Sequence, residues 1–174
     1  MRESVLGEII QFALGKNPTR LNVKEENLYT PEDFERDLFG QDLIHTNAGC
    51  IINLINTKCA PISVSTESKC ITSNFLRCMF DQGILNPWYF CYQFNEGKDF
   101  KRQIAMYHQG TTLSVKKLNV SAIEKLVIRL PDIGVQNQIG DLYRLSLIQY
   151  NQMIGQAENM KQFMFALINK MEER

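Results

Sequence analysis

The chain has 174 residues, of which 44% are hydrophobic and 22% charged, and its formal net charge at pH 7 is zero. This length and composition suffice for one globular domain with an appendage. The zero net charge argues against a protein that holds polyanions by bulk charge alone. No run of about 20 apolar residues is present, and residues 1–15 lack a cleavable signal pattern, so we expect a cytoplasmic protein with no membrane partner.

The charges are distributed unevenly along the chain. Seven acids and one base between residues 25 and 42 give that segment a local charge of minus six. Seven bases and two acids between residues 98 and 130 give a local charge of plus five. A molecule polarised in this way can present one basic face to nucleic acid. The alternative is that each charged run is an ordinary solvated surface.

The chain has an odd number of cysteines and no Cys-x-x-Cys pair; the five are Cys50, Cys59, Cys70, Cys78 and Cys91. Only His45 and His108 could join them in a metal site. We therefore expect reduced and mostly buried thiols, with no metal and no cofactor.

Catalytic motifs are scarce. The sequence contains no G-x-G turn for a methyl donor, no G-x-S-x-G elbow and no P-loop. Residues 86–89, Asn-Pro-Trp-Tyr, resemble an amino-methyltransferase signature that lacks its second proline, and residues 67–69, Glu-Ser-Lys, resemble the end of a metal-nuclease cluster without its partner acid. The sequence therefore predicts a binding protein and no enzyme.

The first half of the chain predicts short elements. Val5, Ile9, Ile10 and Leu14 suggest a short amphipathic opening that ends at Gly15. Pro31 after Thr30, followed by two acids, is typical of a helix start. Short runs rich in β-branched residues predict strands near residues 51–55, 62–64 and 70–72.

The second half begins with the densest aromatic stretch, residues 88–94, which follows Asn86-Pro87 and predicts a short helix packed into the core. Ser121 and Glu124 fit a capping box. Residues 126–130 then predict a strand that Pro131 ends.

From about Gln136 to Glu173 the composition predicts one long helix. Its apolar residues follow a seven-residue repeat typical of a coiled-coil seam, formed by Ile139, Tyr143, Tyr150, Met153, Met160, Met164, Leu167 and Met171. The alternative is a core helix that folds back on its own domain.

Several segments carry a family resemblance in sequence order; they are residues 6–10, 15–18, 51–55, 71–75, 85–92, 109–112 and 126–131. Leu130-Pro131 followed by Gln136 is similar to a family junction in which a Glu-Gln pair starts a long helix, with Val135 here in place of the glutamate. Together they resemble the target-recognition domain of Type I restriction-modification specificity subunits.

The resemblance implies an α/β (α+β) fold. A compact recognition domain over residues 1–132 would carry a twisted, mostly antiparallel or mixed sheet with short helices, and residues 133–174 would form a long spacer helix. A complete specificity subunit has two such domains and two such helices, so this chain is similar to one half. We accordingly expect a homodimer that binds double-stranded DNA and the methyltransferase subunit of the same system, without catalysis of its own.

The residues expected to contact DNA are of two kinds. Lysine and arginine would bind phosphates, and amide and hydroxyl side chains would bind the edges of the nucleobases. They are Lys98, Lys101, Arg102, Gln109, Thr111, Thr112 and Lys116, with Lys58, Asn74 and Arg77 as weaker candidates. Each could equally be a plain surface residue, and Thr111 and Thr112 could simply close a β-turn. Two other functions stay open: a truncated specificity-like regulator that binds other subunits without stable DNA binding, and a small nuclease that uses Glu67.

Overall fold

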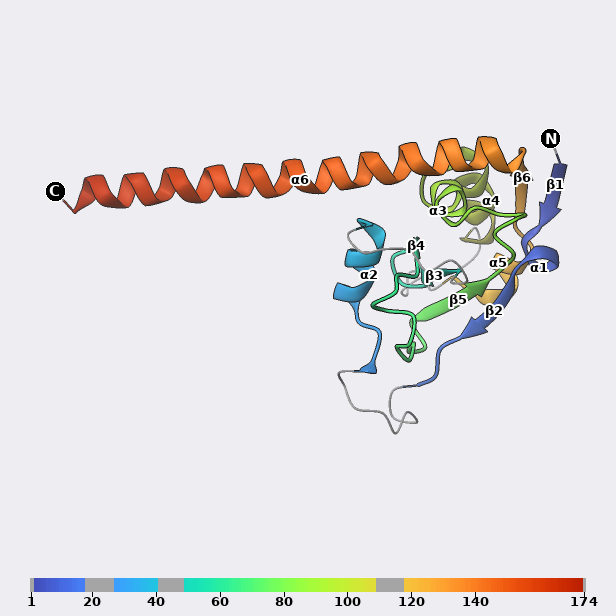
Figure 1. The fold of residues 1–174 in the computed structure, drawn as a ribbon. Coiled ribbons are helices and arrows are strands. Elements are labelled where there is room, and N and C mark those ends of the chain that lie inside the picture. Colours follow the sequence, from blue (N-terminus) through green and yellow to red (C-terminus); the bar gives the residue numbers. More distant parts are fainter. Residues whose placement is uncertain (1, 18–26, 41–48, 109–117, 174) are drawn as a thin grey trace.

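The computed structural model describes residues 2–17, 27–40, 49–108 and 118–173. A region of short strands and helices is followed by one long helix that extends past it (Figure 1). In chain order the elements are β1 (Arg2–Val5), α1 (Leu6–Ile9), β2 (Gln11–Leu14), α2 (Pro31–Leu38), β3 (Cys50–Asn53), β4 (Lys58–Pro61), β5 (Phe75–Met79), α3 (Pro87–Glu96), α4 (Lys98–His108), α5 (Val120–Glu124), β6 (Val127–Leu130) and α6 (Ile133–Glu172).

The strands of the described residues form two antiparallel sheets. One has four strands in the order β2-β5-β3-β4, and the other has two strands, β1 and β6. The predicted antiparallel α+β fold with short helices and a long C-terminal helix is therefore confirmed.

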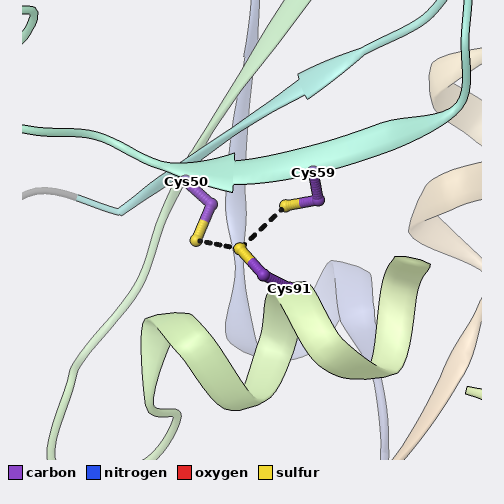
Figure 2. Close-up of side chains that lie close together, drawn as sticks. All are labelled: Cys50, Cys59 and Cys91. Atoms are coloured by element: carbon purple, nitrogen blue, oxygen red, sulfur yellow. Dashed lines mark hydrogen bonds between the residues drawn. The ribbon is translucent and has the colours of Figure 1, made fainter. Parts of the chain in front are cut away.

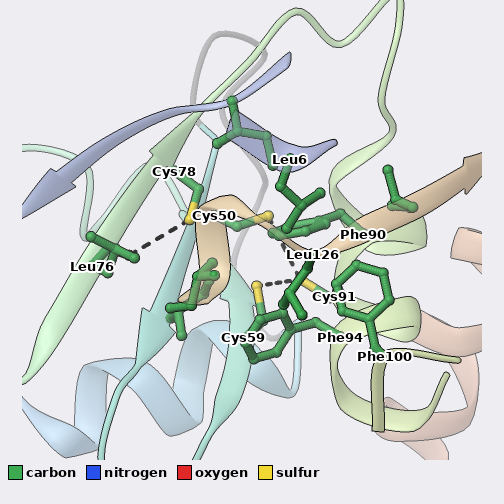
Figure 3. Packing of buried hydrophobic residues seen from close by; sticks show 14 of the residues in the cluster. Leu6, Cys50, Cys59, Leu76, Cys78, Phe90, Cys91, Phe94, Phe100 and Leu126 are labelled. Carbon is green, nitrogen blue, oxygen red and sulfur yellow. Dashed lines mark hydrogen bonds between the residues drawn. The ribbon is translucent and has the colours of Figure 1, made fainter. Parts of the chain in front are cut away.

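Strand β3 is buried on both faces of the larger sheet. Cys50 and Ile52 point into the main core, which α3 and α4 cover and which includes Leu6, Phe90 and Leu126 (Figure 3). Ile51 points the other way, into a smaller cluster with Phe34 of α2. Two covered faces explain why the sequence here is continuously apolar instead of alternating.

Two predicted helix starts are confirmed. The Thr30 hydroxyl accepts from the Asp33 backbone N–H while the Asp33 carboxylate accepts from the Thr30 N–H, which forms a capping box ahead of α2. The Asn86 side chain accepts from the Tyr89 N–H at 2.9 Å and caps α3, with Pro87 at its first position. Four of the five aromatic residues of α3 pack in the core, as predicted, namely Trp88, Tyr89, Phe90 and Phe94.

Local side-chain hydrogen bonds shorten or displace two predicted strands. Asn53 accepts from the Ile55 N–H at 3.0 Å, so β3 ends at Asn53. The segment predicted near 62–64 is replaced by β4 at Lys58–Pro61, because Ser63 enters a turn with the Thr66 hydroxyl. The segment at 70–72 makes isolated bridges through Cys70 and Thr72.

One further prediction was wrong, and another was incomplete. The short opening segment consists of a strand, a single helical turn and a second strand, because β1 pairs with β6 and the Leu6 N–H donates to the Leu126 carbonyl. The cap of α5 is Asn119, whose side chain accepts from the Ser121 N–H at 2.7 Å, so Ser121 lies inside the helix.

Helix α6 begins at Ile133, three residues before Gln136, where the composition predicted its start, and its 40 residues span about 60 Å. Gln136 of its first turns is buried and lies beside the start of α3. Within the described part of the chain, no helix combines the length and apolar character needed to cross a membrane.

Candidate nucleic-acid interface and helical arm

Helix α4 carries three basic residues that are predicted to contact DNA, and all three are exposed: Lys98, Lys101 and Arg102. Phe100 and Ile104 are buried and fix the opposite face of α4 in the core. The bases therefore project outward. The other predicted contacts in this region, Gln109, Thr111, Thr112 and Lys116, lie outside the described residues.

The Glu96 carboxylate forms ion pairs with two lysines from different elements, both of which are predicted to contact DNA. Lys58 of β4 lies 3.1 Å from one Glu96 oxygen, and Lys101 of α4 lies 2.9 Å from the other. Partial burial opposes ionisation of Glu96, but the hydrogen bonds from Lys101 and Lys58 lower its pKa. The three side chains together therefore present a net charge of plus one at neutral pH, spread over two exposed ammonium groups.

A second group of charges surrounds a hollow between α4 and the two-stranded sheet, lined by Arg102 and Arg129. Arg129 lies 3.1 Å from Asp99 and 3.3 Å from Glu3. Arg102 lies 3.9 Å from the same Asp99. Three basic residues of this run, Lys101, Arg102 and Arg129, thus lie beside acids that neutralise part of their positive charge.

The remaining predicted contacts lie on strand β5 and the turn before it. Arg77 is half-buried, and its guanidinium donates to the carbonyls of Glu67 at 3.0 Å and Lys69 at 3.3 Å, so it holds the preceding turn. Asn74 is exposed and lines a separate shallow hollow with Ile55. The described candidates therefore divide between α4 with its neighbour Lys58 and the start of β5.

The first turns of α6 are fixed to α3. The Gln136 side chain accepts from the Asn86 N–H at 3.0 Å and donates to the carbonyls of Ile84 and Pro131. The Tyr143 hydroxyl accepts from the Asn95 side chain at 3.0 Å, and the Tyr143 ring packs edge-on against Trp88. The direction in which α6 leaves the domain is therefore set by buried contacts.

Further along α6, every residue from 152 to 173 is exposed, and we call residues 152–172 the arm. The arm is about 30 Å long and extends away from the domain (Figure 1). Of the predicted seam, Ile139 and Tyr143 pack against this chain's own core. The other members are exposed by 41% or more and form one stripe, which begins at Tyr150 just before the arm and continues on the arm with Met153, Met160, Met164, Leu167 and Met171.

Sequence reasoning missed two features of this region. The hydrogen bonds by which Gln136 fixes α6 to α3 were not predicted, because a polar residue in a helical pattern gives no sign of burial. The meeting of three cysteines inside the core, described below, was also missed, because their spacing matches no metal motif.

Comparison with solved structures finds a similar arrangement of a small antiparallel domain and a long helix. The solved HsdS subunit from Thermoanaerobacter tengcongensis has a similar fold, with a TM-score of 0.53 and 15% sequence identity. The match covers 90% of this chain and 39% of that one, so the chain spans well under half the length of the HsdS subunit. No protein-family model and no curated protein matches the sequence. The predicted resemblance is confirmed as a likeness of fold.

Proposed function

We propose that this chain is a half-size DNA specificity subunit that pairs with a second copy through the arm. The observation that carries the proposal is the structural match, in which 90% of this chain aligns with the HsdS subunit. Pairing of two copies would bring two domains and two long helices together. An antiparallel, two-fold pairing would place two equal domains on a symmetric, interrupted DNA site.

The exposed stripe on the arm supports this pairing. A solvated helix ordinarily keeps its large apolar residues on a buried face. Here Met160 and Leu167 are 63% and 41% exposed, and the members of the stripe are three or four residues apart, except for one step of seven residues between Met153 and Met160. That spacing matches the contact positions of a two-helix coiled coil.

DNA contact is proposed for Lys98, Lys101 and Arg102 of α4, with Lys58 beside them. Their partial neutralisation by Glu96 and Asp99 predicts weak binding by the chain alone. The methyltransferase subunit of a Type I system would supply the remaining affinity and the chemistry. The alternative function is a regulator that binds other subunits without stable DNA binding. The same ion pairs with Glu96 and Asp99 favour it, because they weaken the attraction of this surface for DNA.

The test is selection from a random duplex pool, with the chain alone and with a Type I methyltransferase subunit. We expect enrichment of an inverted, interrupted sequence, and weaker binding by a Lys98→Ala/Arg102→Ala double variant. Its salt dependence should also be shallower, because fewer counterions are released. The matched control is Lys161→Ala/Lys170→Ala on the arm. If the complex with methyltransferase forms but enriches no sequence, the regulator function replaces the proposal.

A further inference from the structure

Three cysteine side chains from separate elements meet inside the main core. Cys50 lies on β3, Cys59 on β4 and Cys91 on α3, and each is completely buried. The Sγ atom of Cys91 lies 3.6 Å from the Sγ atoms of both Cys50 and Cys59, and all three lie within 4.8 Å of one another. Figure 2 shows the three sulfur atoms pointing toward a common centre.

The backbone holds this arrangement rigidly. In the β3–β4 pairing Cys59 lies opposite Ile52, so Cys50 and Cys59 project from the same face of the sheet. The Asn95 side chain accepts from the Cys59 N–H at 2.7 Å and donates to the Cys59 carbonyl at 2.8 Å. Asn95 lies one turn beyond Cys91 on α3, so the helix that carries the third thiol is bonded to the strand that carries the second.

The spacing of the sulfurs fits a metal ion. If the third Sγ–Sγ separation lies between 3.6 and 4.8 Å, a point equidistant from all three lies about 2.1–2.4 Å from each. This range includes the metal–thiolate bond length of about 2.3 Å. We propose that Cys50, Cys59 and Cys91 bind one soft, thiolate-preferring metal ion in a three-coordinate site.

The composition of the site favours Cu(I). Among the described residues, the group contains three sulfurs and no histidine or carboxylate. Structural zinc sites are almost always four-coordinate, whereas soft thiolate ligands also select Cu(I), which accepts three. The Cys50 Sγ also contacts the Pro87 carbonyl oxygen at 3.6 Å, and a carbonyl is a hard ligand that suits Cu(I) poorly.

Burial determines how the ion would enter. None of the three side chains is accessible in the folded chain, so the ion would bind as the β3–β4 hairpin and α3 come together. Each coordinating thiol releases its proton on binding, and the binding free energy then adds to the stability of the fold.

The test refolds the reduced full chain without oxygen, with Cu(I) held in a weak chelator, and measures bound copper and the thermal midpoint. We expect one Cu(I) per chain and a higher midpoint, with a much smaller shift for Zn²⁺. Cys91→Ala should abolish both effects, and Cys78→Ala, which removes another completely buried thiol, should preserve them. Absence of stoichiometric copper, or copper retained by Cys91→Ala, would overturn the site.

A second measurement uses the unchanged chain and so does not depend on whether a variant folds. X-ray absorption at the copper edge should give three sulfur neighbours at about 2.3 Å. Two sulfurs, or a shell of nitrogen or oxygen, would contradict the three-thiolate site.

Discussion

The side-chain oxygen of Gln136 accepts a hydrogen bond of 3.0 Å from the backbone N–H of Asn86, the residue that caps α3. One contact thus joins the first turns of α6 to the start of the helix that fills the core. The Gln136 side chain is 1% exposed, so its polar atoms have no access to solvent in place of these bonds. The orientation of the arm therefore depends on a buried amide.

Replacing this amide should destabilise the whole chain. Gln136→Leu keeps a similar volume but leaves the Asn86 N–H and two carbonyls without their partner. Buried unpaired groups predict a loss of about 2–4 kcal/mol in the free energy of unfolding. Urea denaturation measures it, with Gln138→Leu on the exposed face of the same helix as control. Equal stability of the two variants would show that the Gln136 side-chain hydrogen bonds do not stabilise the fold.

Two glycines of α6 should respond oppositely to alanine. A Cβ added at Gly140 would lie 2.6 Å from the Asn86 side-chain oxygen and 3.0 Å from the Trp88 Cβ, so Gly140→Ala should push α6 off α3 at a cost of about 1–3 kcal/mol. A Cβ at Gly155 has no heavy atom within 4 Å, so Gly155→Ala should raise helix stability by about 0.5–1 kcal/mol. Thermal unfolding followed by circular dichroism compares them. A Gly140→Ala chain as stable as the parent would contradict this packing.

The sequence predicted those elements whose signals are local. Thr30-Pro31 and Asn86-Pro87 each contain the cap and the first-turn proline, and both helices begin there. Asn119 was missed because the Ser121 pattern satisfied the same rule two residues later. The length of α6 was predictable from its composition, since no proline follows Pro131.

The candidate site was less predictable, because its features depend on tertiary pairing. Lys58 and Lys101 are far apart in sequence, and only the fold brings both to Glu96. Arg77 has the sequence character of a DNA contact, yet its guanidinium binds backbone carbonyls. The heptad pattern likewise continues through Tyr143 into the arm, so the pattern alone could not separate the part of α6 that packs on its own domain from the exposed part.

The stripe on the arm gives a direct prediction about assembly. Met160→Asp/Leu167→Asp should convert a dimer into a monomer of 20.1 kDa, because a carboxylate would be buried against the partner helix. Light scattering across a concentration series measures the mass. The control adds the same charge beside the stripe, in Gln152→Asp/Asn159→Asp. A dimer that survives the first pair of changes, or is lost equally in the control, would refute the seam.

The last prediction concerns the buried Asp33 and its partner Lys69, whose Nζ lies 2.7 Å from the carboxylate. Burial opposes ionisation, but hydrogen bonds from Lys69 and the Thr30 N–H outweigh it and lower the pKa of Asp33 below 3.8. A lowered pKa in the folded state means that the unfolded chain binds more protons. The stabilisation from Asp33 is therefore complete above pH 3.8 and is lost as the pH falls through the lowered pKa.

Lys69→Met should therefore destabilise the chain by about 1–3 kcal/mol at pH 7, since it removes a charged hydrogen bond from a buried carboxylate. The difference from the parent chain should shrink as the pH falls through the pKa of Asp33, because a protonated carboxyl no longer pairs with Lys69. Urea denaturation between pH 2.5 and 7 tests both statements, with Lys125→Met at an exposed position as control. A difference that stays constant over this range would assign the effect of Lys69 to the packing of its methylene groups, because packing does not depend on the charge of Asp33.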